Sequence, residues 1–173
     1  MNKVLLNQLI YFKRVNVPKY IEAKIQTTAL KHLSLPDMGK LRDRMEGQSY
    51  YNKLRVDIFS EYAFENIIGI RNFDWGKRSI KSYKRKKYIF EDKVLDIITF
   101  VNESLPKLSS EHVNNCIFVY INTNDNRVLV SGLATKKHIS EIINKKESKI
   151  IEISDFKDLI ELSSIEDLID KME

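Results

Sequence analysis

The chain has few glycines and prolines, a single cysteine and no long apolar run, and these shortages exclude several classes of protein. Its 173 residues include five Gly, three Pro and one Cys. A single cysteine cannot form an internal disulfide, which fits a cytoplasmic location. No run of 18 apolar residues occurs, so we expect no membrane span. Cys116 lies in an apolar stretch and is expected to be a buried small hydrophobic side chain.

Common catalytic signatures are also missing. The three histidines, His32, His112 and His138, are scattered without the spacing of metal ligands. There is no Gly-rich phosphate loop, no Ser-His-Asp grouping and no Cys-His zinc pattern. Surface positions are therefore expected for the histidines, and any chemistry must come from carboxylates and basic residues.

Charge is distributed unevenly along the chain. Residues 147–173 contain nine acidic and three basic residues, a net charge of −6, whereas the whole chain carries +5. Residues 1–146 therefore carry +11. The acidic tail is expected either to shield a basic surface of the same protein or to keep a helix soluble.

The segment of residues 77–87 carries much of this positive charge. Trp75 comes just before it, and Tyr83 and Tyr88 interleave with its basic residues. Such a pattern favours contact with nucleic-acid phosphates and stacking on bases, with DNA as the expected partner. A solvated, lysine-rich loop is the alternative that stays open. Eleven positions hold seven bases and no acid: Lys77, Arg78, Lys81, Lys84, Arg85, Lys86 and Lys87.

Apolar spacing predicts helices first and strands later. Pro18 separates the first two helices, since proline disfavours a helical residue before it, and Asp37 is a candidate cap for the third. Helices are predicted over residues 3–14, 19–33, 38–45 and 50–68. Two β-hairpins follow, at 86–90 with 94–100 and at 117–121 with 127–131, around a loop at 101–115. A helix over 135–146 capped by Thr135, a strand at 150–153 and two short acidic helices complete the prediction.

This order of elements predicts an α+β fold with a central mixed β-sheet flanked by helices. We expect an N-terminal helical segment over residues 1–46. The remaining residues, 47–173, are expected to form an α/β core that ends in acidic helices.

Asp96 interrupts an otherwise apolar strand. A carboxylate in such a strand is costly unless it has a partner. Ligation of a metal ion and acceptance of hydrogen bonds from a neighbouring tyrosine, lysine or backbone amide are both consistent with the sequence. Asp57, Glu61 and Glu65 form a second acidic feature, because their spacing of four places them in one column on the long helix. Three aligned carboxylates repel one another, so a compensating cation or basic residues are expected beside them.

The order of these features resembles a known family. Glu61 on a helix, Asp96 in a hairpin strand, and Gly132-Leu133-Ala134 at the end of a later strand resemble small phage-type members of the PD-(D/E)xK nuclease superfamily, over roughly residues 50–160. The resemblance implies a restriction-endonuclease-like fold in which Glu61 and Asp96 are catalytic and bind Mg²⁺. It implies a DNA endonuclease of phage or mobile-element origin.

The sequence departs from that family at one important position. Ile98 stands where the superfamily carries its catalytic lysine. Either another lysine, such as Lys77 or Lys93, reaches the site, or the protein keeps the fold without catalysis. In the second case it acts by binding nucleic acid, or as an inhibitor or accessory factor on a protein partner. An alternative alignment uses Asp74 with Glu91-Asp92-Lys93 as a literal E-x-K, although these three residues also suit a hairpin turn.

Overall fold

The protein is an α+β structure with a mixed five-stranded sheet flanked by helices, which confirms the predicted fold class. The computed structural model describes residues 12–85, 87–102, 106–109, 111–112, 114–146, 150–156 and 158–172. The elements are β1 (Lys13–Val15), α2 (Lys19–Leu33), α3 (Met38–Arg42), α4 (Met45–Ile67), α5 (Trp75–Arg78), β2 (Tyr88–Phe90), β3 (Lys93–Val101), β4 (Lys107–Ser109), β5 (Asn115–Asn122), β6 (Arg127–Ala134), α6 (Lys136–Lys145), β7 (Ile150–Glu152), a 3-10 turn (Ile153–Asp155) and α7 (Ile165–Lys171).

The central sheet has the strand order β1-β6-β5-β3-β2. The β3–β5 pair is parallel and the other three pairs are antiparallel, so the sheet is mixed. Both predicted hairpins are present, as β2–β3 and β5–β6. Glu91 and Asp92 turn between β2 and β3 with φ values of 48° and 71°. Positive φ at both central residues is the geometry of a tight hairpin turn.

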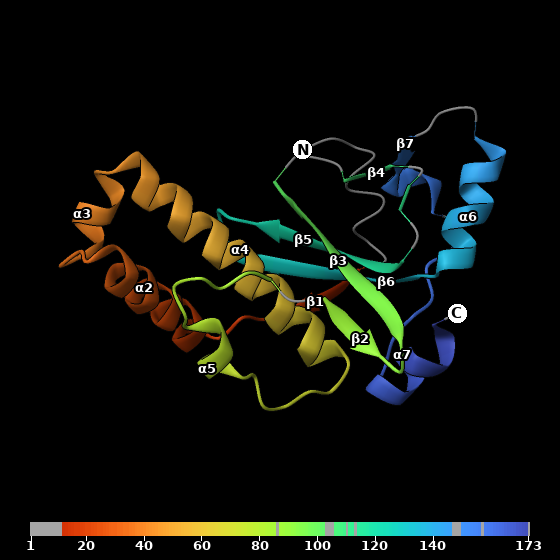
Figure 1. Ribbon diagram of the computed structural model, residues 1–173, viewed down its shortest axis with the longest axis horizontal. Coiled ribbons are helices and arrows are strands. Elements are labelled where there is room, and N and C mark those ends of the chain that lie inside the picture. Colours follow the sequence, from red (N-terminus) through yellow and green to blue (C-terminus); the bar gives the residue numbers. More distant parts are fainter. Residues whose placement is uncertain are drawn as a thin grey trace.

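Helices and a small second sheet cover the two faces of the central sheet. On one face, α2 and α4 pack against inward side chains such as Leu95, Ile97 and Val119. On the other face, Phe100, Phe118 and other side chains pack with α6 and with the two-stranded β4–β7 sheet. Figure 1 shows α2 and α4 at one end of the molecule and α6 with β4 and β7 at the other. Each face of the sheet therefore has its own apolar core.

The N-terminal region differs in part from its prediction. The helix over 19–33 is confirmed as α2. Residues 13 and 14, expected in a helix, belong instead to β1, which pairs with β6 at the edge of the sheet. The pairing with β6, a contact distant in sequence, overrides the local helical pattern. Residues 3–11 of that predicted helix lie outside the described residues. Because β1 joins the central sheet and α2 packs in the same core as α4, side chains of β1, α2 and α3 belong to the core on the α4 face of the sheet.

Several boundaries also shift. The long helix α4 begins at Met45 rather than near residue 50, and the one-turn helix α5 was not expected. The predicted loop 101–115 contains β4, whose partner is the predicted last strand, β7. Asp37 and Thr135 cap α3 and α6 as predicted, each accepting a hydrogen bond from a backbone N–H in the first turn.

Cys116 is fully buried on β5, as predicted. Burial raises the pKa of its thiol to about 12, so the thiolate is not formed at neutral pH. Within the described ranges, no helix has both the length and the apolar character needed to span a bilayer.

Gly132 allows the C-terminal part of the chain to approach β6 closely. Leu133 and Ile160 exchange two backbone hydrogen bonds, of 2.7 and 3.0 Å, beside this glycine. A Cβ atom at Gly132 would overlap the carbonyl oxygen of Ile160. The backbone of Ile160 cannot stay in place if residue 132 has a side chain.

The variant Gly132→Ala is therefore expected to lower the free energy of unfolding by about 1–3 kcal/mol, the usual cost of overpacking. The matched control is Gly76→Ala on α5, where the nearest atom to a new Cβ is the movable Asp74 carboxylate oxygen at 3.3 Å. That control should change stability by less than about 1 kcal/mol. Urea denaturation followed by far-ultraviolet circular dichroism measures both, and equal losses would contradict the steric explanation.

Candidate functional site

Three carboxylates on α4 face the connection between α4 and β2. Asp57, Glu61 and Glu65 lie four residues apart and so share one side of the helix. Glu61 is fully buried and Glu65 nearly so, while Asp57 is partly buried. A buried carboxylate is stable as an anion only with a paired charge and hydrogen bonds. The expected compensating bases are present, and they come from the basic segment 77–87.

The short helix α5 places Arg78 between two of these carboxylates. Arg78 donates through Nε to Oε2 of Glu61 and through Nη2 to Oε1 of Glu65, the latter at 2.5 Å. Its Nη1 also donates to the carbonyl of Asp74, at 3.0 Å. The Arg78 side chain is 3% exposed, so these bonds replace nearly all of the guanidinium's contact with water. Arg78 therefore forms internal ion pairs with Glu61 and Glu65 and is not available to a ligand at the surface.

Aromatic side chains close around this pair. The hydroxyl of Tyr88 donates to Oε1 of Glu65 at 2.8 Å, and the Phe73 ring centroid lies 3.9 Å from the guanidinium carbon of Arg78. Burial, and then the charges of Glu61 and Glu65, raise the pKa of Tyr88 well above its usual range. Burial alone would lower the pKa of Arg78, but its hydrogen bond to Glu61 and the charge of Glu61 raise it above the ordinary value. Arg78 thus remains charged and Tyr88 protonated at neutral pH.

Arg85 forms a second anchor nearer the other end of the column. Its Nη1 lies 3.8 Å from Oδ1 of Asp57 and donates to Oγ1 of Thr99 at 2.5 Å. Thr99 Oγ1 is in turn 2.9 Å from Oγ of Ser60 on α4. Burial raises the pKa of Asp57, and the charge of Arg85 acts in the opposite direction. Because Thr99 is on β3, Arg85 fixes the basic segment to the sheet as well as to α4.

The lysines of the same segment point outward. Lys77, Lys81, Lys84 and Lys87 are exposed, whereas Arg78 is buried. Lys77 pairs with Asp74 at 3.1 Å, and the other three make no ion pair with a described residue. Lys86, also predicted to bind nucleic acid, lies outside the described residues. The segment thus separates into inward arginines and outward lysines.

The aromatic residues near the lysines are only partly those expected. Tyr88 is 3% exposed, so its ring is not presented for stacking. Tyr83 is partly buried, and its hydroxyl lies inside the protein. Trp75 is partly exposed, with Nζ of Lys24 5.5 Å from its ring centroid. Tyr20, from α2, is 55% exposed nearby. Local sequence could not identify Tyr20, because it lies more than fifty residues before the basic segment.

Asp96 and Glu61 are on opposite sides of the sheet. Side chains alternate along β3, and Leu95 and Ile97 pack toward α4 on the Glu61 side. Asp96 therefore points to the other face, where it accepts a hydrogen bond from Nδ2 of Asn114 at 2.9 Å. The structure does not bring the two predicted catalytic carboxylates together.

Asp96 accepts a hydrogen bond, as the second alternative predicts, but the donor is the amide side chain of Asn114 and not the expected tyrosine, lysine or backbone amide. Besides Asn114, Nε2 of His112 lies 3.8 Å from the Asp96 carboxylate. Ile98, at the position of the superfamily's lysine, packs against the second core. No lysine contacts Asp96 among the described residues. Asp96 is thus engaged by Asn114 and His112, and Glu61 does not converge on it.

The predicted Mg²⁺ ligands do not fit a shared ion in this arrangement. Glu61 is held by the Arg78 guanidinium, and Asp96 lies across the sheet. In the described ranges, no three His, Cys, Asp or Glu side chains gather closely enough to form a metal site. A divalent cation needs several oxygen ligands on one side, which these residues do not supply.

The alternative E-x-K alignment meets a different difficulty. Glu91 and Asp92 are exposed in the β2–β3 turn, as the hairpin interpretation predicts. Lys93 donates through Nζ to the carbonyl of Met172 at 2.6 Å, at the end of α7. Asp74 instead caps α5, accepting a hydrogen bond from the backbone N–H of Lys77 at 3.3 Å. Asp74 and Lys93 therefore make structural contacts in different parts of the fold, while Glu91 and Asp92 form the turn.

Comparison with known proteins does not extend the family resemblance. No protein-family model, curated protein or solved structure matches the chain. The geometry of the basic segment, residues 77–87, is therefore the strongest indication of a functional site.

Removal of Arg78 tests how much its ion pairs with Glu61 and Glu65 stabilise the folded protein. Arg78→Ala leaves Glu61 and Glu65 buried without their cation, so we expect the free energy of unfolding to fall by about 3–5 kcal/mol. Arg78→Lys should recover only part of that loss, since an ammonium cannot span both carboxylates as a planar guanidinium does. Urea denaturation measures the change.

The matched control is Lys81→Ala in the same segment. It removes one positive charge at an exposed position without an ion pair among the described residues, so stability should stay within about 0.5 kcal/mol. A loss at residue 78 no larger than that at residue 81 would mean that the buried network does not hold the segment in place.

Proposed function

We propose that this protein binds nucleic acid through the outward lysines of residues 77–87 without using Glu61 and Asp96 for catalysis. The observation that supports this proposal is the division of the segment into inward arginines and outward lysines. Arg78 and Arg85 fix the backbone, while Lys81, Lys84 and Lys87 project their charges into solvent. These three ammonium groups, the lysine row, have no ion-pair partner among the described residues, so they can attract a phosphate backbone and release its counterions.

The acidic tail makes no ion pair with residues 77–87 among the residues that the structure describes. Its described carboxylates form ion pairs with Lys13, Lys146 and Lys171, none of which lies in the basic segment. Leu168 on α7 is buried in the core beside α4, so the tail is docked by apolar contacts. Among the described residues, the positive charge of residues 77–87 thus receives no neutralising contact from the tail.

We do not propose that Glu61 and Asp96, the carboxylates implied by the family resemblance, carry out catalysis. Hydrolysis of a phosphodiester by a nuclease of that superfamily needs acidic side chains that converge on Mg²⁺. Here Glu61 neutralises Arg78, and Asp96 accepts from Asn114 on the other face. The proposed role is that of a nuclease-like protein that binds nucleic acid without cleaving it.

The test is salt-dependent binding to labelled DNA and RNA, measured by fluorescence anisotropy. The triple variant Lys81→Ala/Lys84→Ala/Lys87→Ala should weaken binding and flatten the plot of log affinity against log salt by about 0.7–0.9 per lysine. The control changes the same number of exposed lysines on β4 and α6, with Lys107→Ala/Lys136→Ala/Lys145→Ala, and should bind as the parent protein does. Equal losses in both triple variants would count against a defined binding face.

Incubation with plasmid and single-stranded DNA in Mg²⁺ or Mn²⁺ separates binding from cleavage. We expect no cleavage in either metal. Cleavage by the parent protein that is lost in Asp96→Ala would overturn the non-catalytic part of the proposal. Binding without cleavage would support it.

A protein partner is the second candidate, favoured by two exposed apolar side chains near the lysines. Ile80 is 53% exposed and Ile89, on the edge strand β2, is 64% exposed. If no nucleic acid binds at low salt, an acidic protein surface with an apolar centre becomes the better candidate for this face.

A further inference from the structure

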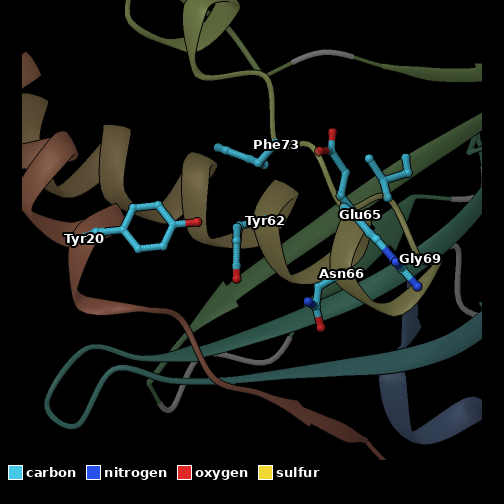
Figure 2. A pocket seen from close by; sticks show the side chains of 8 residues that line it. Tyr20, Tyr62, Glu65, Asn66, Gly69 and Phe73 are labelled. Atoms are coloured by element: carbon cyan, nitrogen blue, oxygen red, sulfur yellow. The ribbon is translucent and has the colours of Figure 1, made fainter.

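Two adjoining hollows lie between α2, the end of α4 and the chain leading to α5. Their volumes are about 260 and 270 Å³, and they share Tyr20, Arg71 and Phe73 in their walls. Figure 2 shows Tyr20 reaching from α2 toward Tyr62 on α4, with Phe73 nearby. We call the two hollows together the aromatic cleft. Its side chains most relevant to binding are Tyr20, Tyr62, Asn66, Arg71, Phe73 and Trp75.

The aromatic rings of the cleft form connected walls. Tyr62 and Phe73 meet edge to face, with centroids 5.5 Å apart, and Phe73 lies 6.3 Å from Trp75. Burial, and then the neighbouring Tyr20, raise the pKa of Tyr62, so its hydroxyl remains a hydrogen-bond donor at neutral pH. Because Tyr20 is more than half exposed, its ring gives an incoming planar group a surface for stacking.

Cationic side chains border these rings. Nζ of Lys24 lies 5.9 Å from the Tyr20 centroid and 5.5 Å from the Trp75 centroid. Arg71 is exposed and has no ion pair or hydrogen bond with another described residue. Glu65 also lines the cleft, but its carboxylate is engaged by Arg78 and Tyr88. The free charges at the opening are therefore positive.

We infer that the aromatic cleft receives an unpaired base of a single-stranded nucleic acid, with the adjacent phosphate at Arg71 and Lys24. This inference rests on the proposed function, and it specifies single strands as the preferred ligand. Rings supply stacking to any base, and Asn66 offers an exposed amide to a base edge. A paired base in a duplex has both faces stacked and cannot enter such a cleft without leaving its helix.

The cleft and the outward lysines are continuous along the chain. Trp75 and Lys77 both belong to the single turn of α5, with Trp75 lining the cleft and Lys77 exposed. A strand with one base between the rings can therefore continue along Lys77 toward Lys81. Stacking would set the preference for single strands, and the lysines would supply sequence-independent affinity.

Tyr20→Ala is the decisive variant. It should weaken binding of a single-stranded oligonucleotide about 5- to 150-fold, the range for loss of one stacked base. Duplex binding through the lysines should change less than twofold. Tyr20→Phe, which keeps the ring, should bind single strands as the parent does. Thermal unfolding of both variants checks that α2 remains folded.

An abasic oligonucleotide of equal length separates bases from phosphates. Its affinity should be the same for the parent protein and for Tyr20→Ala, because it has nothing to stack. Arg71→Ala should weaken binding of both normal and abasic strands, since Arg71 contacts phosphate. Tyr20 dependence with the abasic strand would overturn the stacking role.

Trp75, the single tryptophan, reports on the cleft directly. A single strand with bases should change its fluorescence emission, and the abasic strand should not. Titration with free nucleoside monophosphates distinguishes a small-molecule site: saturation by a mononucleotide more tightly than by the oligonucleotide would overturn the assignment to a strand.

The outcomes also separate the two proposals. If the lysine triple variant loses affinity but Tyr20→Ala does not, the cleft inference fails and the proposed function stands. If the parent protein binds neither single strands nor duplex at low salt, the proposed function fails and the cleft inference fails with it.

Discussion

The arrangement of the candidate site depends on the ion pairs of one buried guanidinium with two glutamates. Glu61 and Glu65 lie inside the protein on α4, and Arg78 is the cation that compensates them. Without Arg78, desolvation of two like charges on adjacent turns would oppose packing of α4 against its neighbours. The same contact fixes α5, and α5 in turn determines where Trp75 and the lysine row lie. An interaction inside the core thus determines the shape of an outer surface.

The chemical difference between arginine and lysine explains why one basic segment serves both purposes. A guanidinium is planar, weakly hydrated and able to donate to two carboxylates at once, so Arg78 and Arg85 suit the inward positions. An ammonium is strongly hydrated and sits at the end of a flexible chain, which suits Lys81 and Lys84 at the surface. Treating all seven bases as one exposed patch overestimates the surface charge, because Arg78 is neutralised inside the protein.

Local pattern predicted much of the fold. Helix α2, the Asp37 and Thr135 caps and both hairpins follow from proline position, capping residues and strand alternation. The carboxylate column also predicted that bases would lie beside it. Contacts between distant residues could not be derived in this way. Pairing of β1 with β6, the β4–β7 sheet and the hollow lined by both Tyr20 and Phe73 all join segments that no local period connects.

The alternation of β3 explains why motif order and site geometry disagree. A strand shows its odd and even positions to opposite faces, so a shift of one residue moves a carboxylate from one core to the other. Asp96 lies between Leu95 and Ile97, both of which face α4, and it must therefore face away from Glu61. In a chain with these strand positions, convergence would require an acid at a residue in phase with Leu95, such as 97 or 99. Those positions hold Ile97, which fills the core, and Thr99, which binds Arg85. The face that packs on α4 is thus built for an ion pair between arginine and glutamate, and the electrostatic requirement of its carboxylates is already met by the protein itself.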